Sequence, residues 1–109
     1  MIALYAPDAL FFGSKARLYV GRSEIREYFD VIPPNYVRDA RFAERRVVWL
    51  KNDVILTSAY VTFVIFAGGA EQALVYRISF TLVETDDGWK IAQHHASPRD
   101  FEAPPDIGR

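Results

Sequence analysis

The first candidate for chemistry is an arginine inside an otherwise apolar segment. Arg77 lies within residues 73–84, where strand alternation places it on one face with Ser79 and Thr81. A guanidinium removed from water needs a partner, and its planar fork matches a carboxylate. Arg77 is therefore a candidate for binding an anionic group of a ligand. The alternatives are an internal salt bridge, for example to Glu44, and a solvent-exposed place at a sheet edge.

Two adjacent histidines, His94 and His95, are the next candidates, because imidazole exchanges protons near neutral pH. Neighbouring residues of a strand point to opposite faces, so at most one of the two can enter a pocket. For the same reason the pair does not make a metal site, and no third ligand stands out. The alternative for His95 is a packing or interface histidine that bonds to the backbone.

Other polar groups carry weaker signals. Tyr28 and Tyr60 offer phenol hydroxyls, although aromatic residues on such faces usually belong to a core. Carboxylates are scarce, since residues 54–66 and 89–97 contain none and residues 73–84 contain only one, at position 84. An isomerase that uses an Asp base and a second acid is therefore disfavoured, and no catalytic residue is named. A charged run is expected to be a solvated strand face, with an anionic-partner site as the alternative: Arg41, Glu44, Arg45 and Arg46.

The bulk properties exclude several classes of protein. The 109 residues make one domain, and half of them are hydrophobic, which is enough for a core. A formal net charge of −1 argues against nucleic-acid binding, and the absence of cysteine excludes disulfides and Cys-ligated zinc. No apolar run approaches the ~20 residues of a membrane helix, and the first ten residues lack signal-peptide features. We therefore expect a cytoplasmic protein without cofactor, metal, nucleic-acid partner or membrane partner.

The elements that position these residues begin with short segments. We expect a turn at Pro7-Asp8, short strands at residues 10–12 and 17–20, and a helix that begins at Ser23, whose hydroxyl can cap it. Pro33-Pro34 ends the helix, because the residue before proline resists the α region. Apolar residues at helical spacing form one face of it: Ile25, Tyr28, Phe29 and Ile32.

From residue 37 the hydrophobic period changes to two, which predicts long strands at residues 37–50, 54–66, 73–84 and 89–97. Short polar or glycine-rich turns join them, so the strands form an antiparallel meander that twists and curls. The helix is then the cover for the concave face. We expect an α+β domain at residues 1–98 and a tail at residues 99–109.

The sheet is predicted to need a second cover. Residues 54–66 are apolar on both faces, and a sheet of that kind must be covered on both. A chain of this length does not supply that cover. We therefore expect a homodimer or a larger assembly that packs through the sheet.

Several motifs resemble those of one family. Residues 4–9 (Leu-Tyr-Ala-Pro-Asp-Ala), the helix start at residues 21–26 (Gly-Arg-Ser-Glu-Ile-Arg), and the ending made of Asp87-Gly88-Trp89-Lys90-Ile91 and His94-His95-Ala96-Ser97 are similar to SnoaL-like domains. The chain resembles the SgcJ/EcaC group of the nuclear transport factor 2-like superfamily, which includes the association domain of calcium/calmodulin-dependent protein kinase II. The likeness covers roughly residues 4 to 98.

The resemblance implies a cystatin-like cone, a curved sheet with helices on its concave face and a pocket between them, in members that assemble through their sheets. It also implies that His94 rather than His95 faces the pocket, although His95 matches the recurrent histidine of the family. Of the arginine cluster in the kinase association domain only Arg77 is matched, and Thr62, Ala96 and Ile25 occupy the other positions. Family members carry a first helix before the segment at which this chain begins, so that helix is expected to be missing or truncated.

We therefore predict a small-molecule pocket for an anionic or polar-headed apolar ligand. The candidate ligand-binding residues are Arg77, His94, Tyr60, Thr62, Tyr28 and His95. The alternatives are a non-catalytic homo-oligomerisation module and an acid–base isomerase, cyclase or dehydratase.

Overall fold

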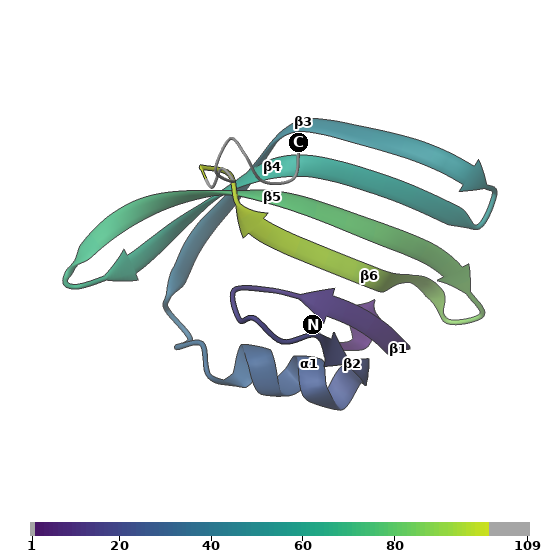
Figure 1. Ribbon diagram of the computed structural model, residues 1–109, viewed down its shortest axis with the longest axis horizontal. Helices are drawn as coiled ribbons and strands as arrows, with labels where there is room; N and C mark the ends of the chain where they lie inside the picture. The colour runs from purple at the N-terminus through teal and green to yellow at the C-terminus, as the bar shows by residue number, and fades with distance from the viewer. Residues whose placement is uncertain (1, 101–109) are drawn as a thin grey trace, which may run out of the picture.

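A curved sheet arches over a helix in the computed structural model, which describes residues 2–100 (Figure 1). Residue 1 and most of the predicted tail, residues 101–109, lie outside the described part. The elements in chain order are η1 (Ile2–Leu4), β1 (Tyr5–Phe12), β2 (Tyr19–Val20), α1 (Gly21–Asp30), β3 (Val37–Lys51), β4 (Val54–Ala67), β5 (Ala70–Thr85) and β6 (Gly88–Pro98).

The four long strands form the predicted antiparallel meander, with each boundary within three residues of expectation. The sheet has six strands in the order β2-β1-β6-β5-β4-β3, and β1 pairs with β6 in parallel. The fold class is thus α+β as predicted, but the sheet is mixed rather than purely antiparallel. The β1–β6 pairing was not predicted, because the two strands are more than 75 residues apart and no local pattern joins them.

The predicted turn at Pro7-Asp8 is wrong, because both residues lie inside β1. The register against β6 shifts between Tyr5 and Leu10, so the segment around the proline is not part of the regular ladder. Proline has no N–H to donate and is tolerated in strands at such irregular places. The second predicted strand, residues 17–20, is shortened to Tyr19–Val20.

Helix α1 does not begin at Ser23 as predicted. It begins at Gly21, whose φ of +81° suits glycine. The side chain of Glu24 turns back and its Oε1 accepts hydrogen bonds from the Val20 amide (2.9 Å) and from Arg17 (2.7 Å). The backbone bond is the main reason that the pKa of Glu24 is lowered. This carboxylate therefore stabilises the helix start in place of a serine cap.

The predicted apolar face of α1 is buried, and the helix packs on β1. Ile25 is fully buried, and Tyr28 and Phe29 pack against the cluster around it. The buried members of this cluster come from the first 25 residues: Tyr5, Ala6, Ala9, Phe11, Tyr19 and Ile25. No helix within residues 2–100 is long and apolar enough to cross a membrane.

The sheet face toward α1, called the concave face below, is defined by alternation along β4 and β5. It carries Val61, Ile65 and Ile78, which are buried. The opposite face is the convex face. Helix α1 lies beneath the sheet, and the ends of β3–β6 near residues 52–53 and 86–87 stand clear of it, as does the β4–β5 hairpin near residues 68–69 (Figure 1).

Two irregularities change which side chains reach the concave face. In β3 the register shifts between Ala43 and Arg46, and Glu44 there has φ +54°. In β6, Thr81 pairs with Gln93 but Leu82 pairs with Ile91, so one residue of β6 is left without a cross-strand partner. Strict alternation in β6, on which the sequence analysis relied, therefore fails before residue 93.

Candidate ligand-binding site

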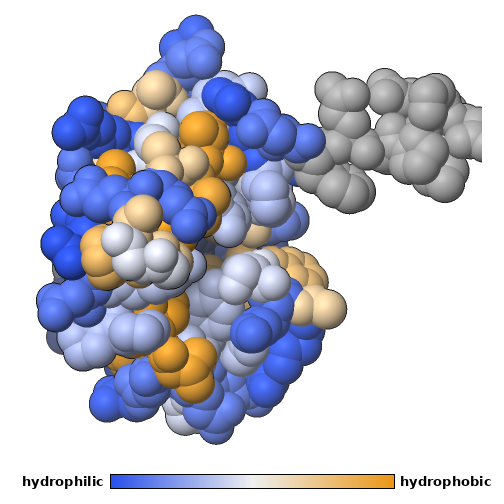
Figure 2. Space-filling model, turned by 90° about the vertical axis from the view of Figure 1, so that its left-hand side faces the viewer, coloured by the Kyte–Doolittle hydropathy of each residue, from blue (hydrophilic) through white to orange (hydrophobic). Residues whose placement is uncertain are grey.

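The concave face has two neighbouring hollows, and Ile78 lies at the wall of both. The proximal pocket, between α1 and the sheet, has a volume of about 370 Å³. Figure 2 shows a hollow between the upper and lower parts of the molecule, with apolar surface on both. The lining of the proximal pocket is mostly aromatic and aliphatic, including Phe11, Tyr28, Phe29, Phe63, Tyr76, Ile78, His94 and Ala96.

His94 is the polar group that β6 contributes to this pocket. Its ring stacks on Phe80 with centroids 4.4 Å apart and lies 4.7 Å from the ring of Phe11. Burial, with a smaller contribution from the charge of His95, lowers the pKa of His94 from 6.5 to about 4. The imidazole is therefore uncharged at neutral pH.

The hydroxyl of Tyr5 determines which ring nitrogen of His94 carries the hydrogen. Tyr5 Oη lies 2.9 Å from His94 Nδ1, and burial raises the pKa of Tyr5 to about 12, so the phenol keeps its proton. If the phenol donates to Nδ1, the imidazole hydrogen sits on Nε2, which has no partner among the described residues. In the reverse arrangement Nδ1 carries the hydrogen and donates it to the Tyr5 oxygen. Nε2 again has no partner among the described residues, and the phenol hydrogen then lacks an acceptor as well. Donation by Tyr5 leaves fewer groups unpaired and is therefore favoured.

The mouth of the pocket is formed by the segment after β1. Tyr28 Oη is bonded to the backbone N–H of Ser14 (2.9 Å) and to its hydroxyl (2.8 Å). The close approach requires a glycine at position 13, because a Cβ there would come within 2.6 Å of the Tyr28 ring. Tyr28 thus lies at the pocket, but its hydroxyl is already engaged.

The remaining predicted site residues do not reach the proximal pocket. Arg77 is exposed on the convex face, directly opposite Tyr60 on β4 and Ser97 on β6. Thr62 and His95 share that face, and His95 packs on Phe12 with ring centroids 5.5 Å apart. The expectation that Arg77 and His94 converge in one cavity is therefore wrong. The opposite face of β5, with Tyr76 and Ile78, is the one that lines the pocket.

The second hollow, called the distal groove, has a volume of about 450 Å³ and lies where α1 does not cover the sheet. Arg45 contributes to its wall, although the charged run around it predicted a solvated strand face. The sequence does contain a pattern that indicates the true direction of Arg45. The apolar residues Ala40 and Phe42 are at even positions, whereas Val47 and Trp49 are at odd ones, and such a change of parity within one strand indicates a bulge.

Within residues 2–100 no group of three or more His, Asp or Glu side chains is placed to hold a metal ion. Polar side chains that line the two hollows, among them His94 in one and Arg45 in the other, can take part in hydrogen bonding.

The chain belongs to the SnoaL-like domain family, whose model matches residues 1–100. A search of curated proteins finds no match. One similar solved structure is a Xanthomonas campestris protein, named for the calcium/calmodulin-dependent protein kinase II association domain. It is 23% identical with a TM-score of 0.83, and the match covers 93% of this chain and 73% of that one.

A ketosteroid isomerase-like protein from Erwinia carotovora atroseptica is also 23% identical, with a TM-score of 0.75, over 94% of this chain and 79% of the other. An NTF2-like protein from Novosphingobium aromaticivorans, described as having a cystatin-like fold, is 14% identical, with a TM-score of 0.74, over 94% and 69%. At these identities the similarity confirms the predicted cystatin-like fold and does not carry an activity.

Proposed function

We propose that this domain binds a small, uncharged and largely apolar molecule in the proximal pocket, with one polar group directed to His94. The observation that supports this most is an aromatic cavity of about 370 Å³ whose wall holds a neutral imidazole with an unpaired, buried Nε2. Ligand sites in proteins are typically apolar hollows of about 300–1,000 Å³ with a few placed polar groups.

The preference for an uncharged ligand follows from the placement of the charged residues. Arg77, the predicted anion-binding group, lies on the opposite face of the sheet. Lys15 is the one cation in the described lining, and it is exposed at the mouth, where water and salt screen it. No carboxylate belongs to that lining either, so a carboxylate base for isomerase or dehydratase chemistry is not at hand. The proposal is therefore one of binding.

The test uses two probes of one shape, 4-methylacetophenone and 4-methylbenzoate, titrated into ¹⁵N-labelled protein. We expect the neutral ketone to bind more tightly and to shift the amides of His94 and Ala96. In Ala96→Phe a larger side chain fills the pocket and should abolish these shifts. Ser97→Phe is the matched control, because Ser97 lies on the convex face. Tighter binding of the benzoate, or unchanged binding by Ala96→Phe, contradicts the proposal.

A second function, self-association through the convex face, is supported by apolar side chains that remain exposed there. Leu56 and Val48, which pair across β3 and β4, are 38% and 52% exposed. Phe66, on the same face of β4, is 41% exposed. A similar structure, the association domain of the C. elegans calcium/calmodulin-dependent protein kinase II, is 18% identical with a TM-score of 0.74, over 87% of this chain and 75% of that one. We propose that two copies cover these residues by packing sheet on sheet.

Light scattering after size exclusion tests this second function. We expect a dimer or larger species at micromolar concentration, and a shift to monomer in Leu56→Asp. Leu18→Asp is a matched control, since Leu18 is 39% exposed but lies before β2, away from the convex face. A monomeric wild type, or equal dissociation by both variants, contradicts self-association through this face.

A further inference from the structure

We propose that the distal groove is a second binding site, for an amphipathic carboxylate whose apolar chain lies along the groove and whose head group pairs with Arg45. The residues that line this groove differ from those of the proximal pocket except at Ile78. The proposal therefore does not depend on the function proposed above.

The floor of the distal groove is apolar. It is formed by aliphatic and aromatic side chains from β4, β5 and β6, among them Ile55, Phe80, Leu82 and Ile91. At its rim Phe42 and Val47 are 51% and 52% exposed. Helix α1 does not reach the strand ends near residues 52–53 and 86–87, so this part of the concave face is open among residues 2–100 (Figure 1). An apolar hollow of this kind favours a molecule with a hydrocarbon body.

The bulge in β3 directs a cation to this apolar surface. Phe42 is on the concave face, so strict alternation would send Arg45 and Val47 to the convex face. The extra residue reverses the parity, and both then line the groove. The bulge requires Glu44 at φ +54°, a conformation that is unfavourable for glutamate. Strained bulges often re-aim a side chain at a functional site.

The charge of Arg45 is not neutralised from within the described chain. The ion pairs among residues 2–100 join Arg17 to Glu24, Arg41 to Asp39 and Arg99 to Asp100, and none includes Arg45. No Asp or Glu belongs to the described lining of the groove. A guanidinium presents a planar pair of donors that matches a carboxylate, so the complementary head group is a carboxylate on the ligand.

Octanoate and 1-octanol, both below their aggregation concentrations, are the probes that test the proposal. They share the hydrocarbon body and differ in the charge of the head. We expect octanoate to bind more tightly, with amide shifts in ¹⁵N-labelled protein at Val47, Ile55 and Leu82. Arg45→Gln should weaken octanoate binding about tenfold, which corresponds to one charge-assisted hydrogen bond.

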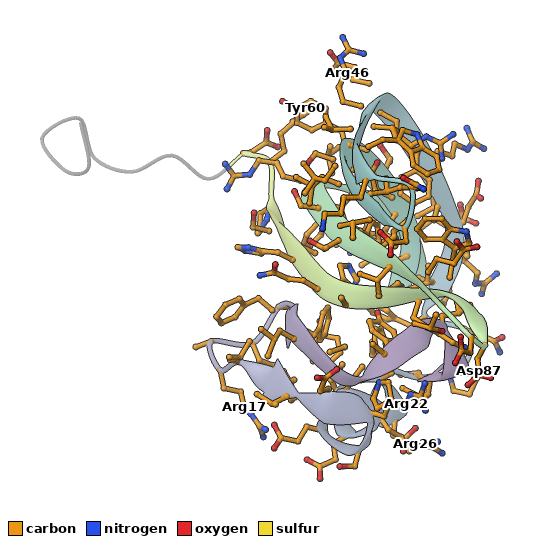
Figure 3. The ribbon with its side chains drawn as sticks, turned by 90° about the vertical axis from the view of Figure 1, so that its right-hand side faces the viewer. Arg17, Arg22, Arg26, Arg46, Tyr60 and Asp87 are labelled. Carbon is orange, nitrogen blue, oxygen red and sulfur yellow. The ribbon has the colours of Figure 1, made fainter. Side chains whose placement is uncertain are left out.

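Arg46→Gln is the matched control, because Arg46 is the next residue and carries the same charge. It pairs with Ser58 on the convex face, and its side chain points away from the sheet (Figure 3). Ala59→Leu, which fills the groove without touching a charge, should weaken both probes. Equal effects of Arg45→Gln and Arg46→Gln, equal binding of the alcohol, shifts centred on His94, or no binding at all would each overturn the proposal.

Discussion

Protonation of His94 should destabilise this domain in a defined pH range. The folded protein holds the pKa of His94 at about 4, against 6.5 for the free side chain, chiefly because the ring is buried among aromatic groups. Between these two values the unfolded chain binds the proton and the folded one does not. Stability is therefore fully present above about pH 6.5 and falls as the pH drops toward 4.

The size of the effect follows from the difference between the two pKa values. The free energy of unfolding is about 2 kcal/mol lower at pH 5 than at pH 8. Well below pH 4 this decrease approaches about 3 kcal/mol. The lowered pKa values of Glu24 and Asp39 act at more acidic pH, below their ordinary values of 4.5 and 3.8. The interval from pH 8 to 5 therefore isolates the histidine.

Urea unfolding followed by the fluorescence of Trp49 and Trp89 measures this loss at each pH. These two rings contact each other across the sheet, with centroids 5.8 Å apart, so unfolding changes their surroundings. His94→Gln should abolish most of the slope between pH 8 and 5, whereas His95→Gln should keep it. If the NMR titration of the His94 ring gives a pKa near 6.5, or if both variants keep the slope, the buried neutral imidazole described above is refuted.

Three further substitutions test other parts of the structure by urea unfolding. Tyr5→Phe removes the hydroxyl that donates to His94 and should cost about 1–2 kcal/mol, while a neutral result would refute the hydrogen bond. Gly13→Ala places a Cβ within 2.6 Å of the Tyr28 ring, so it should lower the free energy of unfolding by about 1–3 kcal/mol and displace Tyr28. The displacement is detectable as a shift of the Tyr28 ring resonances, and unchanged resonances would contradict the close approach. Glu44→Gly should be more stable than Glu44→Ala by about 1 kcal/mol, because only glycine adopts φ +54° without strain, and the opposite order would refute the bulge.

Much of the fold was predictable, because the strands and turns are local features of the sequence. The period of two after residue 37 and the turns at Gly68-Gly69 and Asp86-Asp87-Gly88 place the hairpins correctly. The helix face with Ile25 was also correct, since its spacing reflects burial against one neighbour. The helix start was missed because Glu24 reaches back over the first turn, which spacing alone does not reveal.

The site was less predictable, because side-chain direction depends on register and on which face is covered. Alternation correctly separates Arg77 from Tyr76 and Ile78, but it does not reveal that the face with Tyr76 and Ile78 lines a pocket. An apolar run can be a core or the wall of a cavity, and only the position of α1 distinguishes them. The resemblance of the chain to its family placed His94 correctly at the pocket. Arg45 was not recognised as a lining residue, because a single-residue bulge moves its side chain to the other face.

The parallel pairing of β1 with β6 has a consequence for how the chain folds. Each hairpin of the meander joins neighbouring segments and can form early, whereas β1 must find a strand more than 75 residues further along the chain. Closing such a long loop is entropically costly, so contacts of this kind slow folding. During synthesis, the aromatic cluster built on Tyr5 and Phe11 stays incompletely covered until Ile91 and His94 have left the ribosome. While the chain is incomplete, the apolar side chains of β1 therefore remain exposed and can associate with other molecules.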